Sequence, residues 1–570
     1  MRIAIHDKDR CKPKDCNFLC MRMCPVNRTG GECITESPET KKPVISEAMC
    51  TGCGICVKKC PYDAIKIINL PAALAEPVHQ FGVNGFRLFN LPIPRPGVTG
   101  IVGCNGIGKS TALKILSGEL VPNLGSGAGW EQVLERYRGT ELSEYLKKLS
   151  EKKIKSVYKP QYVESIPRFV SGIVGDILKK ADERGVQDAL VEALDLKNTI
   201  YKDIKAISGG ELQRVAIAAC LSRDADVYLI DEPSGYLDVR ERLNAAKAIR
   251  TLSDKIVFVV EHDLVVLDYL SDNMHVIFGQ TGAYGIISNI MGVRVGINEY
   301  LGGFLRSENM RFRDEIKFGV KPPHSTKKRT TLVEYPDLSK DFGQFKLEVA
   351  AGEIKSPDIL GILGPNATGK TTFMKMLAGA EKPDEGAVDL KVKVSYKPQY
   401  IQPKEELVAS LGLKGEILEK FRLTHMLDKK MSELSGGELQ RVAIADCLSR
   451  EADIYMLDEP SAYLDVEERL SLAKYLHGFG YDKKVSVIVI EHDILLIDYL
   501  SDELLVFEGE SGISGKANRP LSMRDGMNRF LKQMDTTFRR DPDTGRPRAN
   551  KPGSVKDREQ KGSGEYYYSR

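Results

Sequence analysis

Long apolar segments are missing from this chain of 570 residues. Stretches such as Lys255 to Val260 end within a few residues, whereas crossing a bilayer takes roughly 18 to 20 apolar residues. The N-terminus, MRIAIHDKDRCKPKD, also lacks the apolar core and the small-residue cleavage site of a secretory signal peptide. Both absences predict a protein that spans no membrane and works in the cytoplasm.

A marked charge imbalance is missing too. The net charge is +3, and the hydrophobic share of 42% and the charged share of 28% are close to soluble averages. Total charge therefore says little about partners, and local charge matters more. The length predicts about three or four domains.

Cysteine is scarce beyond residue 60. Nine of the twelve cysteines lie within the first 60 residues, and Cys104, Cys220 and Cys447 are the ones that follow. Because disulfides are rare in a reducing compartment, the nine need another explanation. Their concentration marks a separate N-terminal domain.

The cysteine spacing resembles that of a bacterial ferredoxin. The run Cys50-x2-Cys53-x2-Cys56-x3-Cys60-Pro has the spacing of a half-site whose fourth cysteine ligates the other cluster, and a looser run spans residues 11–25. Zinc is the alternative, but a structural zinc site usually pairs two CxxC units across a longer loop. Cys33 belongs to neither run and is expected to be an ordinary thiol. The resemblance implies two [4Fe-4S] clusters, one on Cys24, Cys50, Cys53 and Cys56 and one on Cys11, Cys16, Cys20 and Cys60.

An internal duplication fixes the rest of the architecture. SGGELQRVAIAACLSRDADVYLIDEPSGYLDV, from Ser208, returns as SGGELQRVAIADCLSREADIYMLDEPSAYLDV, from Ser435. In both copies apolar β-rich runs alternate with helical patterns, which predicts an α/β fold with parallel sheets flanked by helices. The expected domains are an α+β ferredoxin-like domain (1–70), the two copies (71–291 and 329–515), a hinge (292–328), and a second hinge with a tail (516–570).

The first copy alone contains an extra segment, at about 129–155. Its pattern predicts two short amphipathic helices that break at Arg138-Gly139, with lysines crowding the second. The arginine-rich hinges are either plain linkers or paired segments packed where the copies meet. We expect the last ~30 residues, rich in Arg, Lys, Gly and Pro, to be poorly ordered or dependent on a partner.

Both copies contain a phosphate-binding loop of the form GxxxxGK[ST], after an apolar strand and before a helical pattern. Its glycines let backbone N–H groups turn toward phosphate oxygens at the positive end of the helix. We expect the lysines to reach the β- and γ-phosphates of ATP and the hydroxyl residues to bind Mg²⁺. The predicted loop residues are Gly103, Asn105, Gly106, Gly108, Lys109, Ser110 and Thr111, and Gly364, Asn366, Gly369, Lys370, Thr371 and Thr372.

An acidic pair directly follows a buried strand in both copies, as in a Walker B motif. The aspartate is expected to hold Mg²⁺ and the glutamate to orient and activate the attacking water. EHD follows a third strand twice, which places a histidine near the γ-phosphate; a structural histidine is the alternative. The predicted residues are Asp231, Glu232 and His262 in copy one, and Asp458, Glu459 and His492 in copy two.

SGGELQ, between the phosphate loop and the acidic pair, is the motif on which each copy resembles an ABC ATPase. Ser and two glycines open a helix, so its hydroxyl, N–H groups and dipole can clamp a γ-phosphate. In that superfamily the phosphate belongs to ATP held by the opposite cassette, so the resemblance implies two composite sites. It assigns Gln161 and Gln399 to catalysis and Mg²⁺, Asp238 and Asp465 to the D-loops, and Ser208, Gly209, Gly210, Glu211, Ser435, Gly436, Gly437 and Glu438 to trans contacts with ATP.

Adenine usually stacks on an aromatic ring upstream of the phosphate loop. Phe81 or Phe86 in copy one, and Phe342 or Phe345 in copy two, are the candidates. A core position is the alternative for each of them.

The whole order of parts resembles one family, subfamily E of the ABC proteins, the ribosome-recycling RNase L inhibitor family, which is archaeal and eukaryotic. The resemblance covers nearly the entire chain, and the short N-terminus favours an archaeal source. It implies a monomeric ATPase that separates ribosomal subunits after termination or rescue and stays on the small subunit. Its expected partners are rRNA, a release factor or its stalled-ribosome paralogue, and initiation factors.

Two other functions are open from the residues alone. An ABC transporter ATPase is the commonest role for such cassettes, but two different cassettes behind a ferredoxin-like domain do not suit it. An iron–sulfur redox protein coupled to ATP explains the clusters but not the ABC clamp. The lysine-rich insertion and the arginine-rich hinges are expected to contact rRNA phosphates, with a solvated helix face as the alternative for the insertion.

Overall fold

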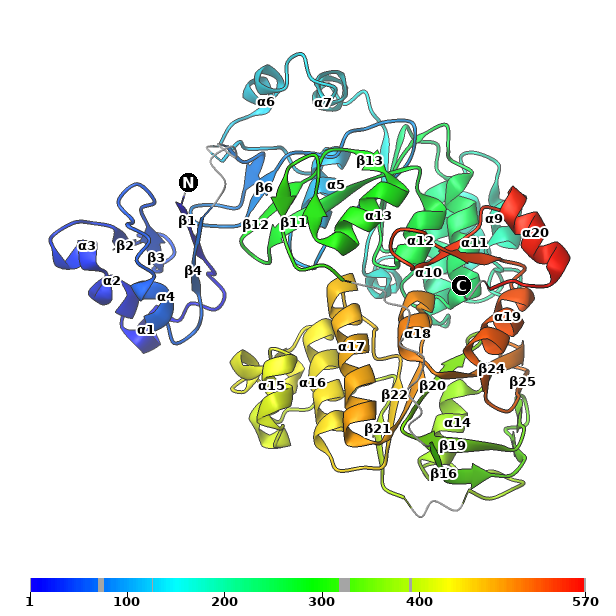
Figure 1. Ribbon diagram of the computed structural model, residues 1–570. Coiled ribbons are helices and arrows are strands. Elements are labelled where there is room, and N and C mark those ends of the chain that lie inside the picture. The colour runs from blue at the N-terminus through cyan, green and yellow to red at the C-terminus, as the bar shows by residue number, and fades with distance from the viewer. Residues whose placement is uncertain (1, 70–75, 126, 317–328, 389–391, 568–570) are drawn as a thin grey trace.

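The computed structural model describes residues 2–69, 76–125, 127–316, 329–388 and 392–567. Figure 1 shows the N-terminal domain beside the first cassette, and the second cassette facing the first. The expected boundary at residue 70 and the hinge residues 317–328 lie outside the described residues. Within the described ranges, no helix combines the length and the apolar character that a membrane crossing requires.

The N-terminal domain is built from two antiparallel strand pairs and short helices. Strand β1 pairs with β4, and β2 pairs with β3. Its small core combines aliphatic side chains with the thiols of Cys20, Cys24, Cys33 and Cys56. The elements are β1 (Arg2–His6), α1 (Pro13–Cys16), α2 (Leu19–Met23), α3 (Pro25–Arg28), β2 (Ile34–Glu36), β3 (Pro43–Ile45), α4 (Ile55–Lys59) and β4 (Ile65–Asn69).

The first cassette is a nine-stranded sheet in the order β5-β6-β12-β11-β7-β10-β9-β8, with β13 beside β11. Strands β11, β7, β10, β9 and β8 run parallel, so their carboxyl ends share one edge. Every residue of β7 and β9 is buried, as continuous apolar runs covered on both faces should be. The elements are β5 (His79–Gln80), β6 (Arg87–Phe89), β7 (Gly97–Val102), α5 (Lys109–Ser117), α6 (Trp130–Arg136), α7 (Ser143–Ser150), β8 (Ser156–Lys159), the 3₁₀ helix η1 (Val163–Arg168), α8 (Val174–Ala181), α9 (Gln187–Ala193), α10 (Gly209–Ser222), β9 (Val227–Asp231), α11 (Val239–Arg250), β10 (Ile256–Val260), α12 (Leu264–Leu270), β11 (Asn273–Gln280) and β12 (Tyr284–Ile287).

The second cassette repeats this sheet in the order β17-β18-β25-β24-β20-β23-β22-β21, with β26 beside β24. The predicted fold class is therefore confirmed. The elements are β16 (Thr330–Tyr335), β17 (Leu338–Asp341), β18 (Lys346–Val349), β19 (Gly352–Ser356), β20 (Asp358–Leu363), α14 (Lys370–Leu377), β21 (Val394–Lys397), η2 (Val408–Leu411), α15 (Gly415–Lys420), η3 (Thr424–Met426), η4 (Met431–Glu433), α16 (Gly436–Ser449), β22 (Ile454–Asp458), α17 (Val466–Lys483), β23 (Ser486–Ile490), α18 (Ile494–Leu500), β24 (Glu503–Glu510) and β25 (Ser514–Ala517).

The extra segment of the first copy forms α6 and α7, which break between Arg136 and Ser143 as the sequence predicts. Leu146 and Leu149 are buried against the cassette, and the Tyr145 hydroxyl donates to the Leu116 carbonyl at 2.6 Å. The lysines all point to solvent, and three of them pair with nearby glutamates. These five lysines are Lys147, Lys148, Lys152, Lys153 and Lys155.

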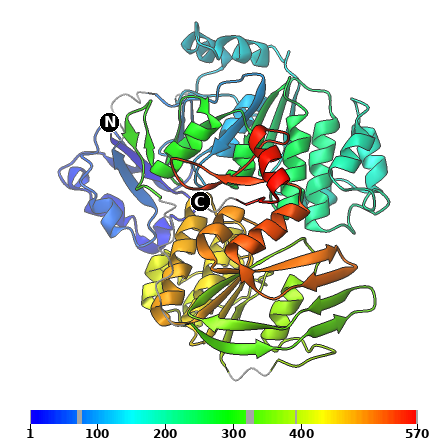
Figure 2. The ribbon, with the colours of Figure 1, turned by 45° about the vertical axis from the view of Figure 1, so that its right-hand side comes forward.

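The two hinges pack together where the cassettes meet. The largest apolar cluster contains residues from both cassettes, from α13 and from the C-terminal segment, and Figure 2 shows that segment at the junction. The hinge elements are β13 (Met291–Gly292), α13 (Val293–Gly302), β14 (Phe304–Leu305), β15 (Met310–Arg311), β26 (Leu521–Ser522), α19 (Met523–Gln533), β27 (Phe538–Arg540), β28 (Pro547–Ala549) and α20 (Val555–Ser563).

The C-terminal residues up to 567 are folded, so the expectation of a poorly ordered tail is wrong for them. Phe538 and Tyr567 are buried, and the side chain of Asn550 donates to Thr537 and Gln560. A basic, glycine- and proline-containing composition suggested disorder, but its charges find partners on the cassettes.

Many arginines of the second hinge are paired within the chain, and an rRNA contact of the hinges stays a prediction. Arg546, fully buried, and Arg548 bind Asp268 on α12 at 2.9 and 2.6 Å. Arg540 binds Asp498 on α18, the equivalent helix of the other cassette. The C-terminal hairpin therefore ties the two cassettes together through equivalent aspartates.

The N-terminal domain docks on the first cassette through the turn between β5 and β6. The buried Asn84 side chain donates to the carbonyls of Ala4 and Ile45 and accepts from the Ile45 amide. The backbone carbonyl of Asn84 accepts from the His6 amide. Arg87 adds an ion pair to Glu47 at 2.7 Å. A movement of the N-terminal domain relative to the cassette must break these contacts.

Candidate functional site

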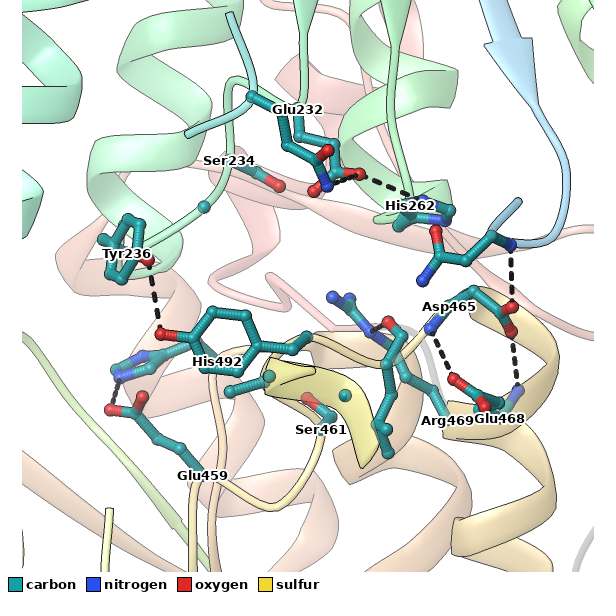
Figure 3. A pocket seen from close by; sticks show the side chains of 18 of the residues that line it. Glu232, Ser234, Tyr236, His262, Glu459, Ser461, Asp465, Glu468, Arg469 and His492 are labelled. Atoms are coloured by element: carbon teal, nitrogen blue, oxygen red, sulfur yellow. Dashed lines mark hydrogen bonds and ion pairs between the residues drawn. The ribbon is translucent and has the colours of Figure 1, made fainter. Parts of the chain in front are cut away.

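The cassettes enclose a cavity of about 2770 Å³. The predicted catalytic glutamates, histidines and glutamines and both SGGELQ segments line it, and Figure 3 shows the Glu–His pair of each cassette at this interface. The nucleotide-site residues predicted from the sequence lie in its wall except Gly103, Gly364, Asp231, Asp458, Asp238, Phe342 and Phe345.

The phosphate loop of each cassette joins a buried strand to a helix. Gly108 has a φ of 96°, and a Cβ there would lie 2.8 Å from the Phe86 ring, so the loop requires glycine at this point. The Lys109 ammonium donates to the carbonyls of Gly103 at 2.9 Å and Cys104 at 2.8 Å. Lys370 makes the equivalent bonds in the second cassette.

The predicted magnesium ligands meet beneath each loop. Ser110 donates to Asp231 at 2.9 Å, and Thr371 donates to Asp458 at 2.7 Å. Asp458 is fully buried, and its Oδ1 has no hydrogen-bond partner among the described residues. Burial raises the pKa of Asp458 to about 6. A buried carboxylate oxygen without a donor, next to a hydroxyl, suits a hard cation such as Mg²⁺.

The catalytic glutamate predicted in each copy is bound by the predicted glutamine and histidine. Gln161 donates to Glu232 at 2.7 Å, and His262 lies 3.3 Å from the same carboxylate. Burial by itself raises the pKa of Glu232, but His262, Lys109 and Gln161 outweigh it and hold the pKa at about 2. This carboxylate is therefore ionised and can accept a proton or a hydrogen bond from water.

The second cassette repeats this arrangement. Gln399 donates to Glu459 at 2.8 Å, and His492 lies 3.2 Å from that carboxylate. Burial lowers the pKa of His492, so its ring is neutral at neutral pH. Burial by itself raises the pKa of Glu459, but His492, Lys370 and Gln399 outweigh it and lower the pKa to about 2. Glu459 is therefore ionised, as Glu232 is.

The backbone of each predicted catalytic glutamate is held in a strained conformation by residues that the sequence did not single out. Glu232 has a φ of 47°. Its carbonyl accepts from Gln213 at 2.7 Å and from the buried Lys159 at 3.2 Å. Gln440 and Lys397 do the same for Glu459, so identity between the two copies was the signal that could have revealed them.

Each phosphate loop is bonded to the opposite cassette. The Asn105 amide donates to Asp465 at 3.0 Å, and the Asn366 amide donates to Asp238 at 2.9 Å. These bonds join residues 360 and 128 positions apart. The geometry therefore produces two sites, each with walls from both cassettes.

The SGGELQ segments begin helices α10 and α16. Ser208 and Glu211 form a capping box, and Ser435 and Glu438 form its counterpart. The first glycine of each segment lies under a D-loop tyrosine ring, which a Cβ at Gly209 would meet at 3.4 Å. These tyrosines, Tyr236 and Tyr463, touch across the interface with their hydroxyls 3.2 Å apart.

The candidate aromatic residues for adenine differ between the cassettes. Phe81, 48% exposed, and Phe86 line the cavity beside the first phosphate loop. Phe342, 50% exposed, and Phe345 stack on each other at 6.4 Å. An exposed ring next to the loop is free to stack on a base, and which ring does so stays a prediction.

Four of the predicted cluster cysteines converge at one small cavity, whose wall includes Cys11, Cys16, Cys20 and Cys60. Burial is the main cause that raises the pKa of Cys20 to about 12, and the other three thiols add to it. Four thiols around one cavity, with Cys60 joining the earlier run, fit an iron–sulfur cluster.

The remaining four predicted ligands form a second group. Burial raises the pKa of Cys56 to about 11, and the thiols of Cys50, Cys53 and Cys24 raise it as well. Cys33, expected to be an ordinary thiol outside both sets, is buried and lies next to Cys24 and Cys50.

Family models match the chain in the order that the sequence predicts. The ABC transporter model matches residues 86–235 and 347–462. The model described as "Possible Fer4-like domain in RNase L inhibitor, RLI" matches residues 1–32, and the 4Fe-4S binding domain model matches residues 43–66. The two cassettes therefore hydrolyse ATP, and the N-terminal domain is an iron–sulfur-binding domain.

Relatives match over the full length. An uncharacterised ABC transporter ATP-binding protein of Methanocaldococcus jannaschii is 54% identical over 100% of this chain and 98% of its own length. The translation initiation factor RLI1 of Saccharomyces cerevisiae is 46% identical over 100% of this chain and 98% of its own length.

Solved structures are similar over most or all of the chain. A model of ribosome-bound archaeal Pelota and ABCE1 contains a chain with a TM-score of 0.94 and 53% identity, covering 100% of this chain and 99% of its own. The complex of archaeal ribosomal stalk protein aP1 with archaeal ribosome recycling factor aABCE1 gives a TM-score of 0.83 and 55% identity, covering 86% of this chain and 99% of its own.

Proposed function

Because the chain belongs to the RNase L inhibitor family, subfamily E of the ABC proteins, we propose that it is an ATP-driven ribosome recycling factor. It separates ribosomal subunits after termination or rescue and stays on the small subunit. The observation that carries this proposal is a pair of bonds, one from each phosphate loop to the D-loop of the other cassette. They make nucleotide binding depend on how closely the cassettes approach.

Glu232 and Glu459 act as the catalytic bases that orient and activate the attacking water. Their ionised state and their bonds to Gln161 and Gln399 support this role. His262 and His492, next to these carboxylates, contact the γ-phosphate. The signature residues Ser208, Gly210, Ser435 and Gly437 clamp the ATP that the opposite phosphate loop holds.

Mg²⁺ is held through Ser110 and Asp231 in the first site and through Thr371 and Asp458 in the second, with Gln161 and Gln399 alongside. The ion neutralises phosphate charge when it is bound. The eight grouped cysteines hold two [4Fe-4S] clusters, whose structural role is to give a small domain a rigid core.

The mechanical step follows from the attachment of the N-terminal domain to one cassette. ATP favours the closed form because it gains the trans contacts only there. Closure moves the first cassette against the second, and the docked iron–sulfur domain swings against the ribosome and the bound factor. Hydrolysis at both sites releases the cassettes again.

The partners are the ribosome, chiefly its small subunit and rRNA, and a release factor or its stalled-ribosome paralogue. The relatives' printed descriptions, which include Pelota and a translation initiation factor, support such partners and add initiation factors. The exposed lysines of α7 and the following turn are the candidate rRNA contacts. The protein works in the cytoplasm as a monomer whose cassettes pair with each other.

Sucrose-gradient sedimentation of ribosomes with this protein, a release factor and ATP tests the proposal. We expect intact ribosomes to disappear into subunits with ATP but not with ADP. Intact ribosomes throughout, with the protein instead bound to a membrane permease, would favour a transporter ATPase. Intact ribosomes together with ATP-dependent reduction of the clusters would favour a redox protein.

A further inference from the structure

Arg242, on α11 just after the first D-loop, lies between the two composite sites. Its Nε donates to the Leu237 carbonyl at 2.8 Å, next to the D-loop residue Asp238. Its Nη1 donates to Asp263 at 2.8 Å and also to the carbonyl of His492 at 3.2 Å. Asp263 directly follows His262 in the sequence. One guanidinium therefore joins the first D-loop to a catalytic histidine of the other cassette.

The surroundings of Arg242 keep it in place. Its side chain is 12% exposed and that of Asp263 is 4% exposed, so the pair has little competition from water. A planar guanidinium has five N–H donors in a fixed fork, and three carbonyl or carboxylate partners occupy it here. Asp493, next to His492, adds a second negative charge near this cation.

The counterpart Arg469 makes a smaller set of bonds. It donates to the Leu464 carbonyl at 2.9 Å and to Asp493 at 3.2 Å, which are the equivalents of Leu237 and Asp263. Within the described part of the chain, no hydrogen bond joins Arg469 to the His262 carbonyl. The bond across the interface is therefore a property of the first cassette's arginine.

The segment from Leu237 to Arg242 thus touches the second site at two points. Asp238 accepts from the Asn366 amide of the second phosphate loop, and Arg242 holds the loop that carries His492. We propose that Arg242 is a positioning residue for hydrolysis in the second site, because it fixes His492 against Glu459 when the cassettes approach. This inference rests on the proposed roles of Glu459 and His492.

Single-site backgrounds separate the two sites. Glu232→Gln silences the first site, so the remaining turnover reports the second, and Glu459→Gln does the reverse. In the Glu232→Gln background, Arg242→Gln should lower kcat by about 10-fold or more with KM for ATP little changed, since a hydrogen bond to a charged group is lost at a geometry-sensitive site. Arg469→Gln in the Glu459→Gln background loses the equivalent bonds within its own cassette and is the matched control, with a smaller loss expected.

A double-mutant cycle distinguishes positioning from a general loosening of the interface. In the Glu232→Gln background, Arg242→Gln should add no further loss to His492→Ala, because the arginine acts through that histidine. Arg242→Lys, which keeps a charge opposite Asp263 but lacks the fork, should also be slow. ATP affinity and unfolding temperature in each variant show whether the fold is intact, and Arg242→Lys carries the test if Arg242→Gln does not fold.

Three results would overturn the inference: equal losses from Arg242→Gln and Arg469→Gln, losses that add fully to His492→Ala, or unchanged turnover in both Arg242 variants. His492→Ala alone tests the underlying site. If it leaves turnover of the second site unchanged, the proposed role of the histidine fails together with the inference. If it slows turnover while Arg242→Gln does not, the inference alone fails.

Discussion

The two cassettes match in their chemistry and differ in what is attached to them. The glutamine-to-glutamate distances are 2.7 and 2.8 Å, and the histidine-to-glutamate distances are 3.3 and 3.2 Å. The first cassette, however, carries the docked N-terminal domain and the α6–α7 insertion, and the described residues of the second carry neither (Figure 1). The duplication thus supplies two similar ATPase sites. Because the N-terminal domain is attached to the first cassette, we expect that cassette to be the one that moves it.

The largest expected effect tests whether the sites are chemically equal. Glu232→Gln and Glu459→Gln should each lower turnover at their own site by about 10² to 10⁴-fold while ATP still binds, because each removes a proposed general base. Steady-state hydrolysis and ATP affinity of the two variants and of the double variant measure this. Unchanged turnover in both single variants would contradict the catalytic assignment.

The iron–sulfur domain is attached to the first cassette. Cys56→Ser should remove one cluster and abolish ribosome splitting while basal ATP hydrolysis persists, because the rigid core of the domain is lost. Cys33→Ser, a neighbouring buried thiol outside both proposed ligand sets, is the matched control and should keep both clusters. Iron content and visible absorbance measure the clusters; loss of a cluster in Cys33→Ser would show that the ligand set is wrong.

The hinge should hold the first cassette more firmly than the second. Asp268→Ala leaves the fully buried Arg546 without its carboxylate, which should cost about 3–5 kcal/mol of unfolding free energy. Asp498→Ala should cost less, because Arg540 is 26% exposed and water can solvate it. Urea unfolding of both variants checks the order, and an equal or reversed order contradicts it.

Docking of the N-terminal domain should give the smallest effect. Asn84→Ala removes the side-chain amide that bonds to Ala4 and Ile45. Leaving these buried backbone groups unpaired should lower the unfolding free energy by about 1–3 kcal/mol. Hydrogen exchange at the Ile45 amide should then become faster. Asn90→Ala, which loses one bond to the Ile287 carbonyl within the cassette, is the control and should leave that amide protected.

The sequence predicts the local parts well because each depends on neighbours along the chain. A phosphate loop needs a strand, glycines and a helix start in succession, and the structure shows this order at Gly103–Ser110. The ferredoxin spacing likewise brings Cys60 to the cavity of the earlier cysteine run.

Contacts between distant segments were not predictable in this way. An arginine-rich tail has the composition of a solvated segment, and nothing in its own residues shows that Asp268 lies opposite Arg546. Arg242 is likewise an ordinary helical arginine until the second cassette brings the His492 carbonyl to it. Lys159 was missed because a lysine after a strand usually reaches solvent, whereas here it is buried under Glu232.

The central claim is that closure of the cassettes moves the iron–sulfur domain as the ribosome splits. Fluorophores placed by unnatural amino acids at the exposed Lys58 of that domain and the exposed Glu451 of the second cassette can report their separation on ribosomes. The account predicts a constant separation before ATP is added and a clear change as the subunits part. Splitting with an unchanged separation would contradict it.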